Sequence, residues 1–320
     1  MLNAGAMGHP GVLNPVDQIW LDGKLVPWDE ANVHILTHSL HYGVAAFEGI
    51  RCYRRADGRS AVFRLQEHLT RLFDSCHICT LEPHYSHGEL AAACLETLRA
   101  NGMTEAYLRP IVFLGHGGLG LGSRDVPTRV AIAAYQWGAY LGDEGLKRGI
   151  RAKVSSFTRG ALNASMSKGK ISGQYVNSVL AKREVIKAGY DEAIMLDGSG
   201  QVAEATGENI FAVVRGRLVT PPLSAAILAG ITRDSVLTLA RDLGIPTVEE
   251  PIARDQLLLA DEVFLTGTAA EVTPVREIDD RAVGTGQPGP ITTRLQQTFF
   301  AATSGQLHPY SRWLTPIPPG

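Results

Sequence analysis

Apolar positions recur with a helical period in two stretches of the first half of the chain. Those of the stretch "FRLQEHLTRLFDSC" are three or four residues apart: Leu65, Leu69, Leu72, Phe73 and Cys76. This period predicts a helix over residues 66 to about 79, with Cys76 facing the core. A second helix is expected over residues 88 to about 100, where Asn101 and Gly102 stop it.

The segments around these helices have the pattern of strands. "IWLDGKLVPW" predicts a hairpin that turns at Asp22 and Gly23, because this dipeptide accepts the positive φ angles of a tight turn. "GIRCYRRADGRSAVFRL" predicts a second hairpin. The continuous apolar runs "AYLRPIVFLG" and "RVAIAAYQWG" are typical of buried strands. We therefore expect an antiparallel first domain covered by helices.

The second half combines short strands with three helices. One helix should begin near Ser172 as N-cap and end at Gly189, a second should cover residues 232–243, and a third residues 291 to about 302. Strands are expected at 150–157 and through 192–220, with turns at 197–200 and 215–216. The glycine-rich and charged stretch 138–149 separates a small α+β domain, 1–137, from a larger domain, 150–320. The Pro-rich tail is expected to lie on the surface.

Composition narrows the class of protein. The formal charge of −2 over 320 residues gives no field that would attract nucleic acid or an acidic membrane. No apolar run approaches the ~18 residues that span a bilayer, and the opening residues lack the pattern of a secretory signal, so a cytoplasmic location is expected. Four cysteines without framework spacing do not predict disulfides, and "CHIC" has no second cysteine pair to complete a zinc site.

The glycine loop "GHGGLGLG" contains the spacing of a dinucleotide-binding fingerprint. That fingerprint works where a strand turns directly into a helix whose N-terminus faces a pyrophosphate. Here the loop continues through Ser123 and Pro127 into another strand. The context argues against NAD binding.

Four other segments combine into a more specific chemistry. "SMSKGKISGQY" carries Lys168 and Lys170, each either a solvated lysine or an amine that attacks a carbonyl, and strand alternation cannot separate them. "GITRDS" and "TGTAAE" offer free amides and hydroxyls that suit a phosphate. In "VAEATGEN", Glu204 could keep a pyridine nitrogen protonated. An amine, an acid and a phosphate cradle are together what pyridoxal phosphate requires.

At this point the chain resembles the branched-chain-amino-acid aminotransferases, class IV enzymes of fold type IV that depend on pyridoxal 5′-phosphate. The resemblance runs from about residue 18 to about residue 302. Its motifs are "HSLHYGVAAFEGIRCY", "FRLQEHLTRL", "AYLRPIVFLG", "WGAYLG", "GKISGQYVNS", "VAEATGENIF", "GITRDSV" and "ADEVFLTGTAAEVTPVR". It implies a mixed α+β fold of two domains, a small antiparallel sheet and a larger pseudo-barrel, with the cofactor at their interface.

The resemblance also implies the roles of individual residues. The family's cofactor lysine stands five residues before a tyrosine, which favours Lys170 because Tyr175 follows at that spacing. The other expected cofactor contacts are Arg71, Tyr175, Glu204, Ile231, Thr232 and Thr268. The expected substrate contacts are Tyr42, Phe47, Gly49, Arg51, Tyr107, Arg109, Trp137, Tyr140, Thr268 and Ala269.

The implied reaction moves the amino group of L-leucine, L-isoleucine or L-valine to 2-oxoglutarate. The implied assembly is a homodimer or a hexamer of dimers, with small-molecule partners and no nucleic acid or membrane. Other class IV enzymes are the alternatives: a D-amino-acid transaminase, an R-selective amine transaminase or an aminodeoxychorismate lyase.

Overall fold

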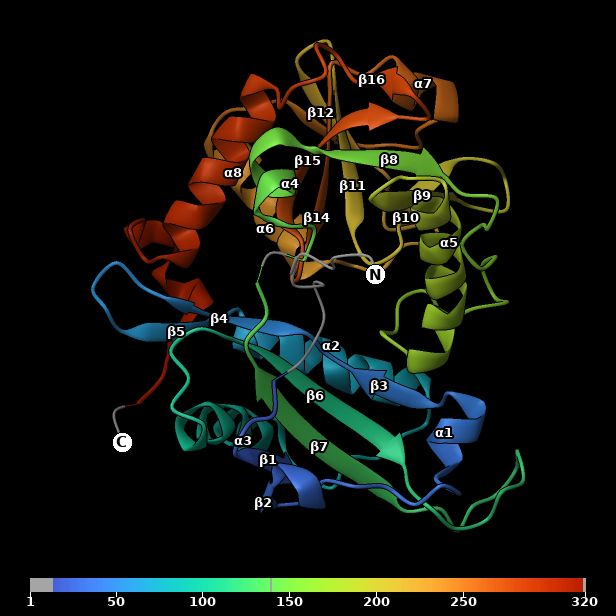
Figure 1. Cartoon of the computed structure of the whole chain (residues 1–320), viewed down its shortest axis with the longest axis vertical. Helices are drawn as coiled ribbons and strands as arrows, with labels where there is room; N and C mark the ends of the chain where they lie inside the picture. The colour runs from blue at the N-terminus through green and yellow to red at the C-terminus, as the bar shows by residue number, and fades with distance from the viewer. Residues whose placement is uncertain (1–13, 139, 319–320) are drawn as a thin grey trace, which may run out of the picture.

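The computed structural model of the chain describes residues 14–138 and 140–318. Its strands form two sheets. Figure 1 shows the first sheet as the lower layer and the second as the upper layer, with helices packed against both. The expectation that no secretory signal opens the chain falls largely on residues 1–13, which lie outside the described part.

The first sheet has eight strands among the described residues, and the pairings seen there are antiparallel. Its order is β17-β5-β4-β6-β7-β1-β2, with β3 paired to β6. The strands are β1 (Gln18–Leu21), β2 (Lys24–Pro27), β3 (Ala45–Phe47), β4 (Ile50–Arg54), β5 (Ser60–Phe63), β6 (Ala106–Leu114), β7 (Thr128–Tyr135) and β17 (Leu314–Pro316). Both predicted hairpins are confirmed. β1 turns into β2 at Asp22 and Gly23, whose φ angles of 47° and 93° lie in the left-handed region that the dipeptide accepts.

Three helices pack on this sheet: α1 (His38–Tyr42), α2 (Leu65–Ile78) and α3 (His87–Ala100). The two helices predicted from the apolar period are confirmed to within one residue at each end. Cys76 is only 1% exposed, as its place in the period predicted. Ser86 and Glu89 form a capping box that fixes the start of α3, because each side chain satisfies the other's free backbone N–H.

The second sheet has nine strands in the described ranges and mixes parallel with antiparallel pairs. Its order is β10-β9-β8-β15-β14-β11-β12-β13, with β16 paired to β15. The strands are β8 (Ile150–Val154), β9 (Glu192–Leu196), β10 (Val202–Ala205), β11 (Asn209–Val214), β12 (Arg217–Thr220), β13 (Thr247–Glu249), β14 (Glu262–Gly267), β15 (Glu271–Ile278) and β16 (Arg281–Ala282). The helices of this half are α4 (Asp143–Arg148), α5 (Tyr175–Lys187), α6 (Ile231–Asp242), α7 (Arg254–Leu258) and α8 (Pro290–Thr303). The described residues also form three 3-10 helices. Two are single turns, η1 (Trp28–Glu30) and η2 (Ser172–Gln174), and the third, η3 (His308–Trp313), is longer. The expected mixed α and β fold class is confirmed.

One cluster of buried apolar side chains joins the two sheets. Its members include Phe63 of β5, Phe211 of β11, Phe264 of β14 and Phe299 of α8. The rings of Phe211 and Phe264 stack with centroids 5.0 Å apart, and Phe299 meets Phe63 edge to face at 5.5 Å. Because side chains of both sheets pack in this core, it fixes the position of the segments that lie between the two sheets.

Two local expectations need correction. Ser172 is not the N-cap of a long helix: it lies in η2, and α5 begins only at Tyr175. The cause is the close approach of Gly173 to Gly43. The Gly43 carbonyl accepts the Gly173 N–H at 3.0 Å, and the Gly173 Cα leaves no room for a side chain on Gly43. The stretch 138–149 also contains the short helix α4. The domain limits on either side of that stretch stay a prediction.

The C-terminal tail is not a surface appendage. β17 pairs with β5 of the first sheet, and Tyr310, Trp313 and Leu314 are buried. The Trp313 ring stacks on Tyr310 at 4.6 Å and meets Phe63 edge to face at 5.8 Å. The Pro-rich end beyond them does reach the surface, as expected, since Pro316 and Pro318 are exposed.

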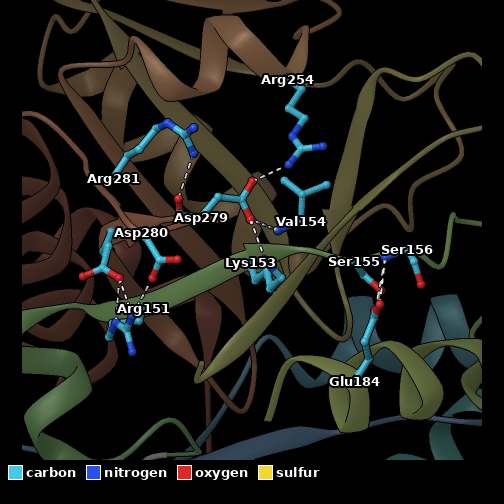
Figure 2. Close-up of polar contacts among 11 residues, drawn as sticks. Arg151, Lys153, Val154, Ser155, Ser156, Glu184, Arg254, Asp279, Asp280 and Arg281 are labelled. Atoms are coloured by element: carbon cyan, nitrogen blue, oxygen red, sulfur yellow. Dashed lines mark hydrogen bonds and ion pairs between the residues drawn. The ribbon is translucent and has the colours of Figure 1, made fainter. Parts of the chain in front are cut away.

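Charged side chains join β8 of the second sheet to the turn between β15 and β16, as Figure 2 shows. The Asp279 carboxylate accepts the Val154 N–H at 3.1 Å and pairs with Arg254 at 2.6 Å. Arg151 donates to Asp280 at 3.1 Å and to the Gly189 carbonyl at 2.9 Å. These contacts join β8, β15 and the turn before β16.

Two absences can be stated for the described part of the chain. None of its helices combines the length and apolar character that crossing a membrane requires. Its histidines, cysteines and acids form no group suited to a metal ion, and each of the four cysteines, all of which are described, is free.

Trp313→Ala should lower the free energy of unfolding by about 3 to 5 kcal/mol, because it removes a large buried ring from the core under β5. Chemical denaturation measures the change. Leu259→Ala is the matched control, since Leu259 is 82% exposed and should change stability by less than ~0.5 kcal/mol. Equal effects of the two variants would contradict the burial of the tail.

Candidate active site

The backbone of Lys170 is fixed from two sides. The Phe47 N–H donates to the Lys170 carbonyl at 3.1 Å, and the Lys170 N–H donates to Ser75 Oγ of α2 at 2.9 Å. A single bridge between Ala46 and Ile171 extends this contact. The segment that carries both candidate lysines is therefore anchored to the first sheet and to α2.

The two lysines point to different partners. Lys170 Nζ donates to Tyr175 Oη at 2.5 Å and lies 4.9 Å from the centre of the Phe47 ring. Lys168 Nζ instead donates to the carbonyls of Ala225 and Ile227 at 2.8 and 2.9 Å. Lys168 thus secures the loop before α6, while the Lys170 amine faces a cavity.

Glu204 lies on β10 and is 5% exposed. Its Oε2 accepts N–H groups of Asn209 and Leu228 at 3.0 and 3.1 Å, and its Oε1 is 2.6 Å from Arg159 Nη2. Burial raises the pKa of Glu204, and the positive charge of Arg159 opposes that rise. The sequence analysis did not identify Arg159, which stands in an irregular segment with no motif around it.

Arg71 projects from α2 and is held by a buried acid. Its Nε and Nη2 donate to the two carboxylate oxygens of Glu48 at 2.7 and 2.9 Å, and its Nη1 donates to the Ala229 carbonyl at 2.8 Å. His68 Nδ1 is 2.7 Å from the same carboxylate. Burial would raise the pKa of Glu48, but Arg71 and His68 hold it well below its usual value. Glu48 and His68 lie within motifs of the resemblance, yet the sequence assigned neither a role.

The start of α6 faces the same region. Gly230 is its N-cap, and a Cβ at this position would be 1.9 Å from Asn209 Oδ1. Glycine is therefore required for the chain to pass Asn209. The N–H groups of Ile231 and Thr232 follow at the helix N-terminus, where backbone donors and the helix dipole favour an anion.

These elements surround a cavity. Ten of the predicted residues line it: Gly49, Arg71, Tyr107, Lys170, Tyr175, Glu204, Ile231, Thr232, Thr268 and Ala269. Gly49 is needed here because a Cβ would be 1.7 Å from the Tyr107 hydroxyl.

Four other predicted residues form an aromatic and cationic wall beside it. The Arg109 guanidinium lies 4.8 Å from the Phe47 ring, Trp137 is 4.6 Å from Tyr107, and Tyr140 is 5.7 Å from Trp137.

Two predicted residues do not reach the cavity. Tyr42 is 42% exposed and donates its hydroxyl to the Leu119 carbonyl at 2.6 Å, so it packs on the glycine loop. The Arg51 guanidinium donates to backbone carbonyls on the outer side of the turn that follows β14. Direct contact between Arg51 and a substrate therefore finds no support in this geometry.

The cavity fits pyridoxal phosphate by the chemistry of its donors. Lys170 supplies an amine, Glu204 a buried acid, and the α6 N-terminus with Arg71 an anion cradle. Thr266 also lines the cavity, and its buried hydroxyl has no hydrogen-bond partner among the described residues. An unsatisfied buried hydroxyl in such a place is expected where a polar ligand completes the contacts.

Comparisons with known proteins agree with this chemistry. The family model described as Amino-transferase class IV matches residues 45–278. The chain is 49% identical over 297 residues to the branched-chain-amino-acid aminotransferase of Pseudomonas aeruginosa, covering 93% of this chain and 96% of the relative. It is similar to the crystal structure of the Escherichia coli enzyme of that name, with a TM-score of 0.93 at 45% identity over 95% of this chain and 100% of the other. The crystal structure of the Thermobaculum terrenum enzyme of that name, in its PLP-form, gives a TM-score of 0.88 at 35% identity, covering 95% of this chain and 99% of the other.

Arg159→Met should destabilise the cofactor-free protein more at pH 8 than at pH 5. The raised pKa of Glu204 means that this carboxyl favours the fold at low pH and loses that contribution as pH rises through its folded value. Removal of Arg159 leaves the ionised carboxylate unpaired, which should cost about 3 kcal/mol at pH 8 and less at pH 5. Chemical denaturation at the two pH values measures both costs.

The control is the same substitution in a Glu204→Gln background. There the cost of Arg159→Met should be independent of pH, because the neutral amide does not titrate. A pH-independent cost in the presence of Glu204 would show that the two side chains are not coupled.

Proposed function

Because the chain belongs to the branched-chain-amino-acid aminotransferases of class IV, we propose that its cavity transfers the amino group of L-leucine, L-isoleucine or L-valine to 2-oxoglutarate. The products are the branched-chain 2-oxo acid and L-glutamate. The chain is an aminotransferase, and its cofactor is pyridoxal 5′-phosphate. The observation that carries the proposal is the Lys170 amine, hydrogen-bonded to Tyr175 in a cavity shared with Glu204 and Arg71.

The proposed cofactor contacts follow from the chemistry of the cavity. Lys170 would bond the aldehyde, Glu204 the ring nitrogen and Tyr175 the phenolic oxygen. Arg71, the N–H groups of Ile231 and Thr232, and Thr268 would bind the phosphate. When bound, the cofactor withdraws electron density from the substrate Cα and so makes its proton acidic.

The protein's part is proton transfer and charge control. Lys170, once free of the cofactor, would take the proton from the substrate Cα through Nζ and later return one. The ion pair with Arg159 at 2.6 Å favours ionised Glu204, which can then keep the ring nitrogen protonated. The Tyr175 hydroxyl lies 2.5 Å from Lys170 Nζ and would orient that amine both for its bond to the aldehyde and for the proton transfer.

The proposed substrate seat must accept both an aliphatic and an acidic side chain. Tyr107 and the N–H groups of Thr268 and Ala269 would bind the α-carboxylate, and Phe47, Trp137 and Tyr140 would contact the branched side chain. Gly49 leaves the space in which the Tyr107 hydroxyl sits. Arg109 would receive the second carboxylate of glutamate. Two observations support this role of Arg109. Its guanidinium lies 4.8 Å from the centre of the Phe47 ring, and its buried Nε has no hydrogen-bond partner among the described residues.

Tyr42 was expected to contact the substrate. Its hydrogen bond to the Leu119 carbonyl supports instead an indirect role, through the position of the glycine loop.

A homodimer, or a hexamer built from dimers, is the proposed assembly. Its support is an exposed apolar face on α5, where Val176, Val179 and Leu180 are spaced by three and four residues and are 63%, 43% and 43% exposed. Other exposed apolar residues include Ile35, Leu36, Leu40, Leu119 and Leu121. A cytoplasmic location is also proposed, since the four cysteines are free.

Val179→Glu combined with Leu180→Glu should dissociate the oligomer, because two charges would enter an apolar interface. Sedimentation velocity should show the wild type at a multiple of the chain mass and the variant shifted toward the monomer. Leu259→Glu is the control. Leu259 is 82% exposed at the end of α7, and this variant should sediment as the wild type. A monomeric wild type at micromolar concentration would refute the proposed assembly.

Lys170→Ala should abolish transamination, with glutamate formation from L-leucine and 2-oxoglutarate falling by about 10³-fold or more. Lys168→Gln should lose less than about tenfold, because that lysine supports a loop and not a proton transfer. Coupled detection of glutamate measures both rates, and borohydride reduction of the wild type should attach the cofactor to Lys170.

The same assay with a panel of L- and D-amino acids separates the alternatives. Turnover restricted to L-leucine, L-isoleucine and L-valine supports the proposed reaction. Turnover of D-amino acids or R-amines, or release of pyruvate from aminodeoxychorismate, would assign one of the other class IV activities. Attachment of the cofactor to Lys168 would reverse the roles of the two lysines.

A further inference from the structure

The Arg51 guanidinium donates four hydrogen bonds to backbone carbonyls, and two of them join the two halves of the molecule. Arg51 lies on β4 opposite Tyr107 of β6. Its Nε donates to the Thr268 carbonyl at 2.9 Å, and its Nη2 donates to the Ala269 carbonyl at 2.9 Å. The other two bonds reach the carbonyls of Trp137 and Gly138 at 3.1 and 2.9 Å. The side chain is thus committed to backbone acceptors on two segments beside the cavity.

The bond to the Thr268 carbonyl fixes the direction of one N–H group of the turn, that of Ala269. In a trans peptide the C=O and the following N–H point to opposite sides of the chain. When Arg51 binds the Thr268 carbonyl, the N–H of Ala269 must point away from Arg51. Thr268 and Ala269 line the cavity and Arg51 does not. The N–H of Ala269 is therefore turned to the side from which a ligand would approach.

A second contact acts on the end of the same turn. Glu271 has a φ of 57°, a left-handed conformation that residues other than glycine disfavour. Its buried carboxylate accepts the Tyr53 hydroxyl at 2.9 Å and lies 3.9 Å from Arg51 Nε. Tyr53 and Arg51 thus hold Glu271, and with it the turn, in a conformation that the local sequence does not prefer.

We propose that Arg51, Tyr53 and Glu271 are positioning residues that hold the turn at 268 and 269 with the Ala269 N–H facing the cavity, and thereby set the affinity for the substrate carboxylate. This inference rests on the proposed function, which gives that N–H group a carboxylate to bind. It assigns Arg51 a role behind the turn, in place of the direct substrate contact expected from the sequence. A purely structural role, in which Arg51 only joins the two sheets, is the alternative.

A pair of ligands that differ only in the acid group separates these roles. 4-Methylpentanoate carries the carboxylate and a branched chain without an amine, and 4-methylpentanamide has the same shape without the charge. In Arg51→Lys, one ammonium cannot hold both peptide planes. Isothermal titration of holoenzyme should show the acid weakened by about tenfold and the amide by less than about twofold. The cofactor's absorbance spectrum should stay unchanged, because Lys170, Glu204 and the α6 N-terminus are untouched.

Two further variants complete the test. Arg151→Lys is the matched control, since Arg151 also donates to a backbone carbonyl and to acids but lies on β8 of the second sheet and does not line the cavity (Figure 2). It should bind the acid as the wild type does. Tyr53→Phe removes one hydroxyl from Glu271 and should weaken the acid by about threefold, which keeps the test available if Arg51→Lys folds poorly.

Unchanged binding of the acid in both Arg51→Lys and Tyr53→Phe, or an equal loss for acid and amide, would overturn the inference. Failure of the proposed function looks different. A wild type that binds the acid in an Arg51-dependent manner, yet transfers no amino group from any L-amino acid of the panel, would refute the reaction and leave the positioning role intact.

Discussion

Buried negative charge is the constraint on which the site depends. Three of the buried carboxylates near the cavity, each 6% exposed or less, are paired with an arginine from another segment, whereas the buried Glu208 lines the cavity without such a pair among the described residues. The pairs are Glu48 with Arg71, Glu204 with Arg159 and Glu271 with Arg51. An unpaired carboxylate in such surroundings would take up a proton or cost several kcal/mol. The arginines therefore decide which acids stay ionised, and their fixed positions in turn set the geometry of the phosphate cradle and of the turn after β14.

Local structure could be predicted from the sequence where one short stretch determines it. The period of α2 and the Asp22–Gly23 turn are of this kind, because apolar spacing and φ preference act within a few residues. Ser172 failed for the opposite reason. Its propensity to cap a helix was overridden by the contact of Gly173 with Gly43, which ends α1 far away in the sequence, so the contact cannot be inferred from the neighbouring residues.

The candidate site could be predicted in part, and mostly through the resemblance. Alternation could not separate Lys168 from Lys170, because their difference arises from Ser75 and Phe47, which fix the backbone at residue 170. Arg159 stands in no periodic pattern, and its partner is on a distant strand. Pairings of this kind follow from the tertiary fold, so a single sequence gives little sign of them.

The strand β17 has a consequence for how the molecule forms. It pairs with β5, so the first sheet gains this outer strand only after residues 314–316 have left the ribosome. Until then β5 presents unpaired backbone groups, and the aromatic side of Phe63 lacks the cover of Trp313. The nascent N-terminal half is therefore exposed to strand addition by other chains throughout most of translation, which makes it the part of the protein for which chaperone protection matters most.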